Sequence, residues 1–459
     1  MIKNRLIKQL VCGALLGMGT LAGTASAQGS DMPPGFGPNP ALPVPHKSLL
    51  PTINVAPATA WHGNAKPVAA PGFSVSAYAR DLHHPRWLYV LPNGDVLVAE
   101  TNAPPKPGEG TGIKRAITNY FMKKAGSATA TANRITLLRG IDQHGVARTR
   151  TVFLEGLNSP FGMALVGNDL YVANTDGVLR FPYQTDQTTI TAKGIQVMDL
   201  PGGPINHHWT KNIVASPDGK LLYVAVGSNS NAGERGIDAE AGRAAIWEFE
   251  PASGKTRIFA SGLRNPVGMA FQPYSKVLWT SVNERDELGN DLVPDYMTSV
   301  QDGAFYGWPY SYFGQHLDDR LMPSNPDLVA SALVPDYALG AHTASLGLAF
   351  YDADLFPSAY RGGAFVGQHG SWNRKPHSGY KVIFVPFLGG KPAGPPQDFL
   401  TGFLDDKGNA QGRPVGVAVD KAGALLLADD VGNIVWRVTP DAKPDAKIDA
   451  NADAKPAAR

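Results

Sequence analysis

Residues 413–429 read Arg-Pro-Val-Gly-Val-Ala-Val-Asp-Lys-Ala-Gly-Ala-Leu-Leu-Leu-Ala-Asp. This stretch is a short apolar segment, a turn at Lys421-Ala-Gly423 and a second apolar segment that ends in a small residue. Glycine suits such a turn because it accepts positive φ without steric cost. The stretch therefore predicts a β-hairpin.

The same unit occurs six times along the chain. The other copies begin at His84, Ser159, Asn212, Asn265 and Ser345, and the last of these is the most degraded. Further apolar segments follow each copy, as in Ala245-Ile-Trp-Glu-Phe249. Regular repetition of a small β-sheet is typical of a propeller, which protects its strand edges by radial repetition. We therefore expect an all-β, six-bladed β-propeller over residues 71–440.

The repeat also predicts which face carries function. The residues before each first strand and after each second strand share one face, and the short turns lie on the other. The connections on the shared face are long and polar, and they span residues 101–134, 227–243, 281–306 and 368–380. Binding and catalytic residues concentrate on such loops over a rigid scaffold.

Neither end of the chain is expected to carry catalytic or binding residues. Residues 1–27 have a basic start, a short apolar run and Ala25-Ser-Ala27, which predicts a cleaved signal peptide and a periplasmic or secreted protein. The only cysteine, Cys12, lies in that segment, which excludes disulfides and c-type haem from the mature chain. Residues 28–70 predict a Pro/Ala-rich arm and residues 441–459 a disordered tail.

The composition of the chain limits the classes of molecule that it is expected to bind. The formal charge of +2 is too balanced to indicate nucleic-acid binding, and no later apolar run is long enough for a transmembrane segment. We expect no nucleic acid and no membrane span.

Six residue pairs precede the first strands, and pseudo-symmetry places them around the mouth of the propeller. They are 83–84, 158–159, 208–209, 264–265, 343–344 and 412–413. This ring contains His208, Arg264 and Arg413. Guanidinium groups pair with carboxylates in a bidentate way, so the ring suits a planar, multiply anionic ligand. The alternative is that each is an ordinary structural or solvated loop residue.

Several motifs resemble a known family. Leu263-Arg-Asn-Pro-Val-Gly-Met-Ala-Phe271 and Phe305-Tyr-Gly-Trp-Pro309 are similar to motifs of the soluble glucose/sorbosone dehydrogenases that use pyrroloquinoline quinone (PQQ). The segments at 100–107, 283–286 and 370–376 are closer to the sorbosone dehydrogenase branch. The resemblance spans about residues 71–438.

The resemblance implies a six-bladed propeller that holds PQQ in the channel mouth over a Ca²⁺ ion. His208 matches the family's catalytic base. The other matches are Arg264 and Asn265 at the quinone oxygens, Arg413 along the cofactor, Arg374 as a candidate for a family lysine, and main-chain carbonyls near Asn283 and Glu284 for calcium. A second family arginine corresponds here to Val415.

The implied reaction is oxidation of a sugar or sugar aldehyde by hydride transfer to PQQ, with His208 as general base. Electrons would then leave to an external acceptor, because the mature chain has no haem motif. Two alternatives stay open: a calcium-dependent lactonase-type propeller and a non-catalytic binding propeller.

Overall fold

The computed structural model describes residues 32–46, 52–104, 120–203 and 205–441. The predicted signal peptide lies outside the described residues, as does the predicted tail beyond Asp441. Within the described residues, no helix combines the length and apolar character needed to cross a membrane.

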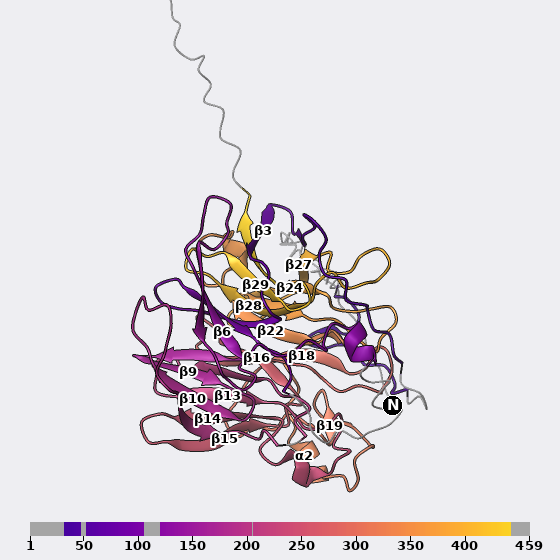
Figure 1. Ribbon diagram of the computed structural model, residues 1–459. Coiled ribbons are helices and arrows are strands. Elements are labelled where there is room, and N and C mark those ends of the chain that lie inside the picture. Colours follow the sequence, from indigo (N-terminus) through magenta and orange to yellow (C-terminus); the bar gives the residue numbers. More distant parts are fainter. Residues whose placement is uncertain (1–31, 47–51, 105–119, 204, 442–459) are drawn as a thin grey trace, which may run out of the picture. The chain divides into compact units, whose positions relative to one another are not determined.

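Six sheets of four or five strands make up the body (Figure 1). Blade I contains β4 (Pro85–Val90), β5 (Val96–Glu100), β6 (Arg134–Arg139) and β7 (Thr149–Leu154); blade II contains β8 (Met163–Val166), β9 (Asp169–Ala173), β10 (Gly177–Pro182) and β11 (Ile195–Asp199). Blade III contains β12 (Lys211–Ala215), β13 (Leu222–Val226), β14 (Ala245–Glu250) and β15 (Lys255–Ser261); blade IV contains β16 (Pro266–Phe271), β17 (Leu278–Val282), β18 (Pro294–Ser299) and β21 (Tyr337–Ala341). Blade V contains β22 (Ser345–Phe350), β23 (Ala364–Gln368), β24 (Lys381–Val385) and β27 (Gln397–Thr401); blade VI contains β28 (Pro414–Val419), β29 (Leu425–Asp429), β30 (Ile434–Pro440) and β3 (Phe73–Ala79).

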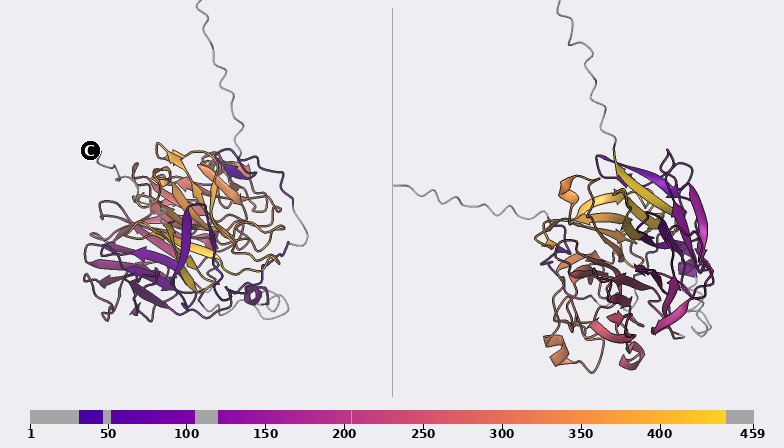
Figure 2. Two further views of the ribbon diagram at one scale, coloured as in Figure 1. Left: turned by 90° about the horizontal axis from the view of Figure 1, so that it is seen from above. Right: turned by 90° about the vertical axis from the view of Figure 1, so that its left-hand side faces the viewer.

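The sheets form a closed ring. The innermost strands β4, β8, β12, β16, β22 and β28 each contact the next, and β28 contacts β4. The early strand β3 pairs antiparallel with β30 and completes blade VI, so the two ends of the repeat region share one sheet (Figures 1 and 2). The predicted six-bladed β-propeller is confirmed, and each predicted hairpin is the inner strand pair of a blade.

Apolar side chains fill the seams between blades. Six buried clusters occur, one for each pair of neighbouring blades. Both faces of most strands are therefore covered, which explains the near-continuous apolar runs in the repeats.

The axis of the ring is also filled. Val267, Leu346 and Val415, from blades IV, V and VI, belong to the same cluster as Trp87 and Phe161 from blades I and II. Gly347 permits this packing, because a Cβ there would lie 2.1 Å from the carbonyl oxygen of Val415. The expected central channel is thus closed by apolar side chains beneath the mouth, and a ligand site is confined to the mouth.

The long connections lie where the repeat predicts, with one correction. The predicted loop 281–306 contains β18, so the connection at the mouth of blade IV is residues 283–293. The described helices are short: residues 120–124, η1 (Ile237–Glu240), α2 (Pro326–Ala330) and η2 (Ser358–Tyr360). Two small hairpins, β19 (Ser311–Tyr312) with β20 (His316–Leu317) and β25 (Phe387–Leu388) with β26 (Lys391–Pro392), complete the structure.

The N-terminal arm adds strands to two blades. β1 (Phe36–Gly37) pairs with β21, and β2 (Val68–Ala69) pairs with β27. Between them, Asn54 donates its backbone N–H to the Trp372 carbonyl at 2.8 Å, and Thr59 donates to the Ala410 carbonyl at 2.8 Å. The arm therefore contacts loops of the elaborated face.

Candidate active site

His208 lies just before β12, and one of its ring nitrogens is anchored. Nδ1 lies 2.8 Å from the Ser228 carbonyl oxygen and 3.0 Å from Ser228 Oγ. Ser228 Oγ donates its own hydrogen to the Ser230 carbonyl at 2.7 Å. Both atoms therefore face Nδ1 as acceptors, so Nδ1 carries the proton and Nε2 is the basic nitrogen.

The surroundings keep this imidazole neutral. Burial, reinforced by the positive charge of Arg264, holds the pKa of His208 well below its ordinary value of 6.5. Nε2 makes no hydrogen bond to another described residue, and a neutral histidine of this kind can accept a proton at neutral pH.

A buried lysine supports the loop that carries His208. Lys211 is fully buried, and its Nζ donates to the carbonyl oxygens of His208 (3.1 Å) and Trp209 (3.3 Å). Burial lowers the pKa of Lys211 well below its ordinary value.

Asn265 lies beside His208 because residue 227 is glycine. A Cβ at Gly227 would lie 2.3 Å from Asn265 Oδ1 and 2.6 Å from His208 Cβ. Asn265 Oδ1 is buried and has no hydrogen-bond donor among the described residues. An orphaned buried acceptor of this kind indicates a missing ligand or water.

The guanidinium of Arg264 is almost fully used by the protein. Nε and Nη2 donate to the carbonyl oxygen (3.1 Å) and Oδ1 (2.9 Å) of Asn231. Nη1 donates to the carbonyl oxygens of Asn283 (3.2 Å) and Glu284 (2.7 Å). Arg264 thus brings positive charge to the mouth while leaving one Nη2 hydrogen, which faces Asp286 Oδ2 at 3.9 Å.

The two residues predicted to hold calcium offer only part of a donor set. Their carbonyl oxygens point to Arg264, whereas the Glu284 carboxylate pairs with buried Arg285 at 3.0 Å. Among the described residues, no group of three or more His, Cys, Asp or Glu side chains could hold a metal ion.

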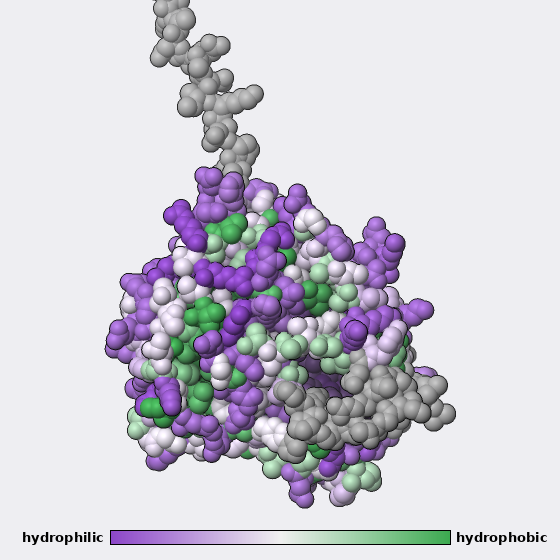
Figure 3. All heavy atoms as spheres, in the orientation of Figure 1, coloured by the Kyte–Doolittle hydropathy of each residue, from purple (hydrophilic) through white to green (hydrophobic). Residues whose placement is uncertain are grey.

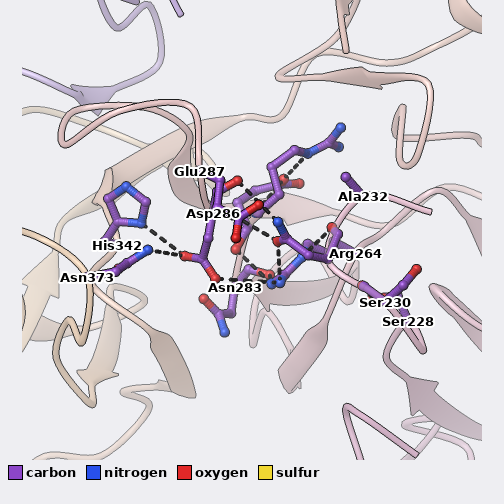
Figure 4. Close-up of polar contacts among 12 residues, drawn as sticks. Ser228, Ser230, Ala232, Arg264, Asn283, Asp286, Glu287, His342 and Asn373 are labelled. Atoms are coloured by element: carbon purple, nitrogen blue, oxygen red, sulfur yellow. Dashed lines mark hydrogen bonds and ion pairs between the residues drawn. The ribbon is translucent and has the colours of Figure 1, made fainter. Parts of the chain in front are cut away.

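Asp286, which faces Arg264, forms a group with His342 and Asn373, and none of the three is among the site residues predicted from the sequence. Asp286 Oδ1 lies 3.1 Å from His342 Nδ1 and accepts from Asn373 Nδ2 at 2.9 Å (Figure 4). Burial opposes ionisation of Asp286, but these contacts and the charge of Arg264 together lower its pKa. His342 Nε2 faces the Gly289 carbonyl at 2.8 Å, so both ring nitrogens face acceptors, and Asp286 and Gly289 outweigh burial to raise its pKa.

Arg413 has the most incomplete surroundings. It is 4% exposed, and its guanidinium carbon lies 4.9 Å from the ring centre of Tyr380. Its Nε and Nη2 are buried without an acceptor among the described residues. A buried guanidinium with unpaired donors predicts an anionic partner.

A second polar group, centred on Asp430, lies next to Arg413 and includes His84 of the predicted ring. The buried carboxylate of Asp430 accepts from Arg86 Nη1 (2.6 Å), and His369 Nε2 lies 2.9 Å away. His84 Nε2 lies 3.8 Å from the same carboxylate. Arg86 also lies 5.9 Å from the ring centre of Trp209, which connects this group to the His208 loop.

Arg374 lies apart from both groups. Its guanidinium donates to the Asn290 carbonyl (2.9 Å), the Pro376 carbonyl (2.8 Å) and Asp291 Oδ1 (2.7 Å). These contacts tie the loop after β23 to the loop after β17, and among the described residues none of the hydrogen bonds or ion pairs of Arg374 reaches Arg264 or Arg413. The structure therefore joins His208, Arg264, Asn265, Asn283 and Glu284 in one network and places Arg413 in a neighbouring one.

The surface carries a hollow with hydrophilic lining, visible below and to the right of the centre in Figure 3.

A family model described as TrAA12-like matches residues 67–300 and 328–440. The chain belongs to this family. The match covers all six blades, with a gap at the 301–327 insertion before β21.

Individual proteins resemble the chain more distantly. An aldose sugar dehydrogenase of Escherichia coli is 34% identical over 104 residues, which is 22% of this chain and 26% of that protein. The holo form of the pyranose dehydrogenase PQQ domain from Coprinopsis cinerea aligns with a TM-score of 0.66 and 20% identity, over 84% of this chain and all of that one. The calcium structure of a family AA12 enzyme from Trichoderma reesei gives 0.65 and 18%, over 86% of this chain and all of that one. At these identities, the two structures bear on the fold alone.

Proposed function

We propose that the protein oxidises a sugar or sugar aldehyde by hydride transfer to PQQ bound at the mouth of the propeller. The observation that carries the proposal is the buried guanidinium of Arg413, whose Nε and Nη2 have no acceptor among the described residues. PQQ is a planar, multiply anionic molecule that would supply these acceptors. Membership of the TrAA12-like family and the likeness to the E. coli aldose sugar dehydrogenase support the same reaction class.

When bound, PQQ supplies a two-electron acceptor for hydride. Arg413 would pair with an acidic group of the cofactor, with Tyr380 beneath the guanidinium. Asn265 would present its unpaired Oδ1 to the mouth, and Arg264 would contribute positive charge. Arg374, given its contacts with Asn290 and Asp291, fits a loop-bracing role better than the role of the family lysine.

His208 would act as the general base. Its Nε2 removes the hydroxyl proton of the substrate while the adjacent carbon loses hydride, which converts CH–OH into C=O. The Ser228 carbonyl keeps its contact with Nδ1 throughout and stabilises the imidazolium that forms. An aldose would give a lactone, and an aldehyde hydrate would give an acid.

The proposal includes a calcium ion, which the carbonyl oxygens of Asn283 and Glu284 would bind. Calcium prefers oxygen ligands, and each carbonyl keeps a second lone pair beside the one used by Arg264. The chemistry of these donors fits the ion, which would polarise a cofactor carbonyl.

Export also belongs to the proposal. The signal-peptide pattern of residues 1–27 supports a periplasmic or secreted enzyme that passes its electrons to an external carrier.

Dye reduction by the purified protein tests the proposal. We expect sugar-dependent reduction of an artificial acceptor only when PQQ is added, with loss on chelation and recovery on return of calcium. Arg413→Ala should weaken PQQ binding about 10–100-fold, because a charge-assisted contact contributes about 1.5–3 kcal/mol. Arg257→Ala is the matched control, since Arg257 is exposed and pairs with Glu248 and Asp302.

Two results would contradict the proposal. Hydrolysis of a lactone by PQQ-free protein would favour the lactonase-type alternative. Saturable glycan binding without dye reduction in the presence of PQQ and calcium would favour a binding propeller.

A further inference from the structure

Residues 228–231 follow β13 and form no regular secondary structure. Backbone N–H groups in such a segment need partners outside a strand ladder. Ser228 N donates to the Arg264 carbonyl at 2.7 Å, Asn229 N to Glu240 Oε2 at 2.6 Å, and Asn231 N to Glu234 Oε1 at 3.0 Å. Two carboxylates and one carbonyl thus set the path of the segment.

This segment contacts both central side chains of the candidate site. Its first residue, Ser228, accepts the Nδ1 hydrogen of His208, and its last residue, Asn231, accepts two hydrogen bonds from Arg264. Figure 4 shows Ser228 and Ser230 on the side of Arg264 away from Asp286 and His342. A shift of the segment would therefore move the partners of both side chains.

Glu240, the last residue of η1, lies behind the segment. Its side chain is buried and accepts hydrogen bonds from the backbone of Asn229 and the hydroxyl of Ser230. The Ser230 carbonyl in turn accepts from Ser228 Oγ, which lies 3.0 Å from His208 Nδ1. A buried carboxylate is costly unless it is hydrogen-bonded, and these bonds to one loop account for its presence.

We propose that Glu240 is a positioning residue that braces residues 228–231, so that His208 keeps its proton on Nδ1 and Arg264 keeps its place. The catalytic consequence rests on the proposed function, whereas the effect on the imidazole tautomer does not. Glu240 contacts neither His208 nor Arg264, and it acts on them through Ser228, Ser230 and Asn229.

Two variants at this position test the proposal. Glu240→Ala removes both bonds, whereas Glu240→Gln can still accept from Asn229 N and contact Ser230 Oγ. Glu250→Gln is the matched control, because Glu250 lies at the opposite end of β14 in the same blade. The first measurement is ¹⁵N NMR of the histidine rings in cofactor-free protein, with His208→Gln to assign the signal. The second is the pH profile of kcat with PQQ, calcium and sugar.

In Glu240→Ala we expect the His208 signal to move from the Nδ1–H tautomer towards a mixture. kcat should fall about 10–100-fold, as for other small misplacements of a reacting group, with a smaller change in KM. Glu240→Gln should restore most of both, and Glu250→Gln should behave as wild type.

An unchanged His208 tautomer and pH profile in both Glu240 variants would overturn the proposal, even if their thermal stability falls. If Glu240→Ala fails to fold, Glu240→Asp decides, because its shorter side chain cannot keep both bonds to Asn229 N and Ser230 Oγ. A shift of the His208 signal from the Nδ1–H tautomer in that variant supports the brace, and an unchanged signal opposes it. If the wild-type protein reduces no dye with PQQ, the proposed function is contradicted. The NMR result then tests only whether Glu240 fixes the tautomer of His208.

Discussion

The chemistry of His208 depends on which nitrogen carries the proton. A backbone carbonyl, rather than a carboxylate, fixes the tautomer, so the imidazole gains orientation without a nearby negative charge to raise its pKa. Burial and Arg264 instead lower the pKa of His208. The result is a base that stays neutral, and therefore active, well into the acid range.

His208→Ala should separate catalysis from binding. We expect PQQ and calcium binding to persist, because neither depends mainly on the imidazole, while turnover falls about 10²–10⁴-fold. Wild-type activity should decline on the acid side, below the ordinary histidine pKa of 6.5, and the variant should lack that limb. Steady-state kinetics across pH measure both effects.

His207→Ala is the control for this experiment, since His207 is adjacent in the chain but its side chain is exposed. Loss of turnover in His207→Ala together with nearly normal turnover in His208→Ala would show that the general base is His207. Normal turnover in both variants would show that neither histidine acts as the general base.

At the level of elements, local patterns were predictable and loop contacts were not. The hairpins follow from turns and apolar runs that are adjacent in sequence, so all six inner pairs were predicted. The residues before the first strands were found because pseudo-symmetry relates them. Asp286, His342 and Asn373 lie in irregular loops whose contacts cross between blades, and no sequence period marks them. Arg374 is the candidate for a family lysine that the resemblance implies, and its guanidinium contacts Asn290 and Asp291.

The N-terminal arm is an element whose contacts reach the candidate site. Trp61 Nε1 donates to Asp429 Oδ2 at 2.7 Å, and Asp429 Oδ1 accepts the backbone N–H of Arg413 at 2.8 Å. The Trp61 ring also packs against Trp436 and Phe403, with ring centres 5.4 and 5.6 Å apart. The arm thereby helps to fix the backbone that carries Arg413.

Trp61→Phe should weaken this support while keeping an aromatic ring. The variant leaves a buried carboxylate with one donor fewer, which costs about 1–3 kcal/mol. We expect a lower unfolding free energy in urea and weaker PQQ binding by fluorescence titration. Tyr274→Phe, at an exposed position, is the control. Equal stability and equal PQQ affinity in Trp61→Phe and wild type would show that the arm does not support Arg413.

At the scale of the whole molecule, the ring is closed by contacts between the first and last blades. Besides the contact between β28 and β4, β3 completes blade VI just before the chain enters blade I, and Asp430 of blade VI contacts Arg86 and His84 of blade I. His369 of blade V contacts the same carboxylate. A buried charge cluster therefore links three blades at the mouth, above the apolar plug of the axis.

This cluster predicts an acid-sensitive stability. Burial lowers the pKa of His369 to about 4, despite the nearby Asp430, whereas an unfolded histidine titrates at 6.5. Below pH 6.5 the unfolded chain therefore binds a proton that the folded protein excludes, so stability is fully present above 6.5 and is lost as the pH falls towards 4. One pKa unit corresponds to about 1.4 kcal/mol, so this residue accounts for up to about 3 kcal/mol of the loss.

His369→Gln removes this contribution but leaves the other titrating groups in place. Urea unfolding of both proteins between pH 8 and 4 should therefore give a free-energy difference that changes in favour of the variant as the pH falls. A difference that stays constant over this range would show that His369 titrates alike in the folded and unfolded states and does not contribute to the acid sensitivity.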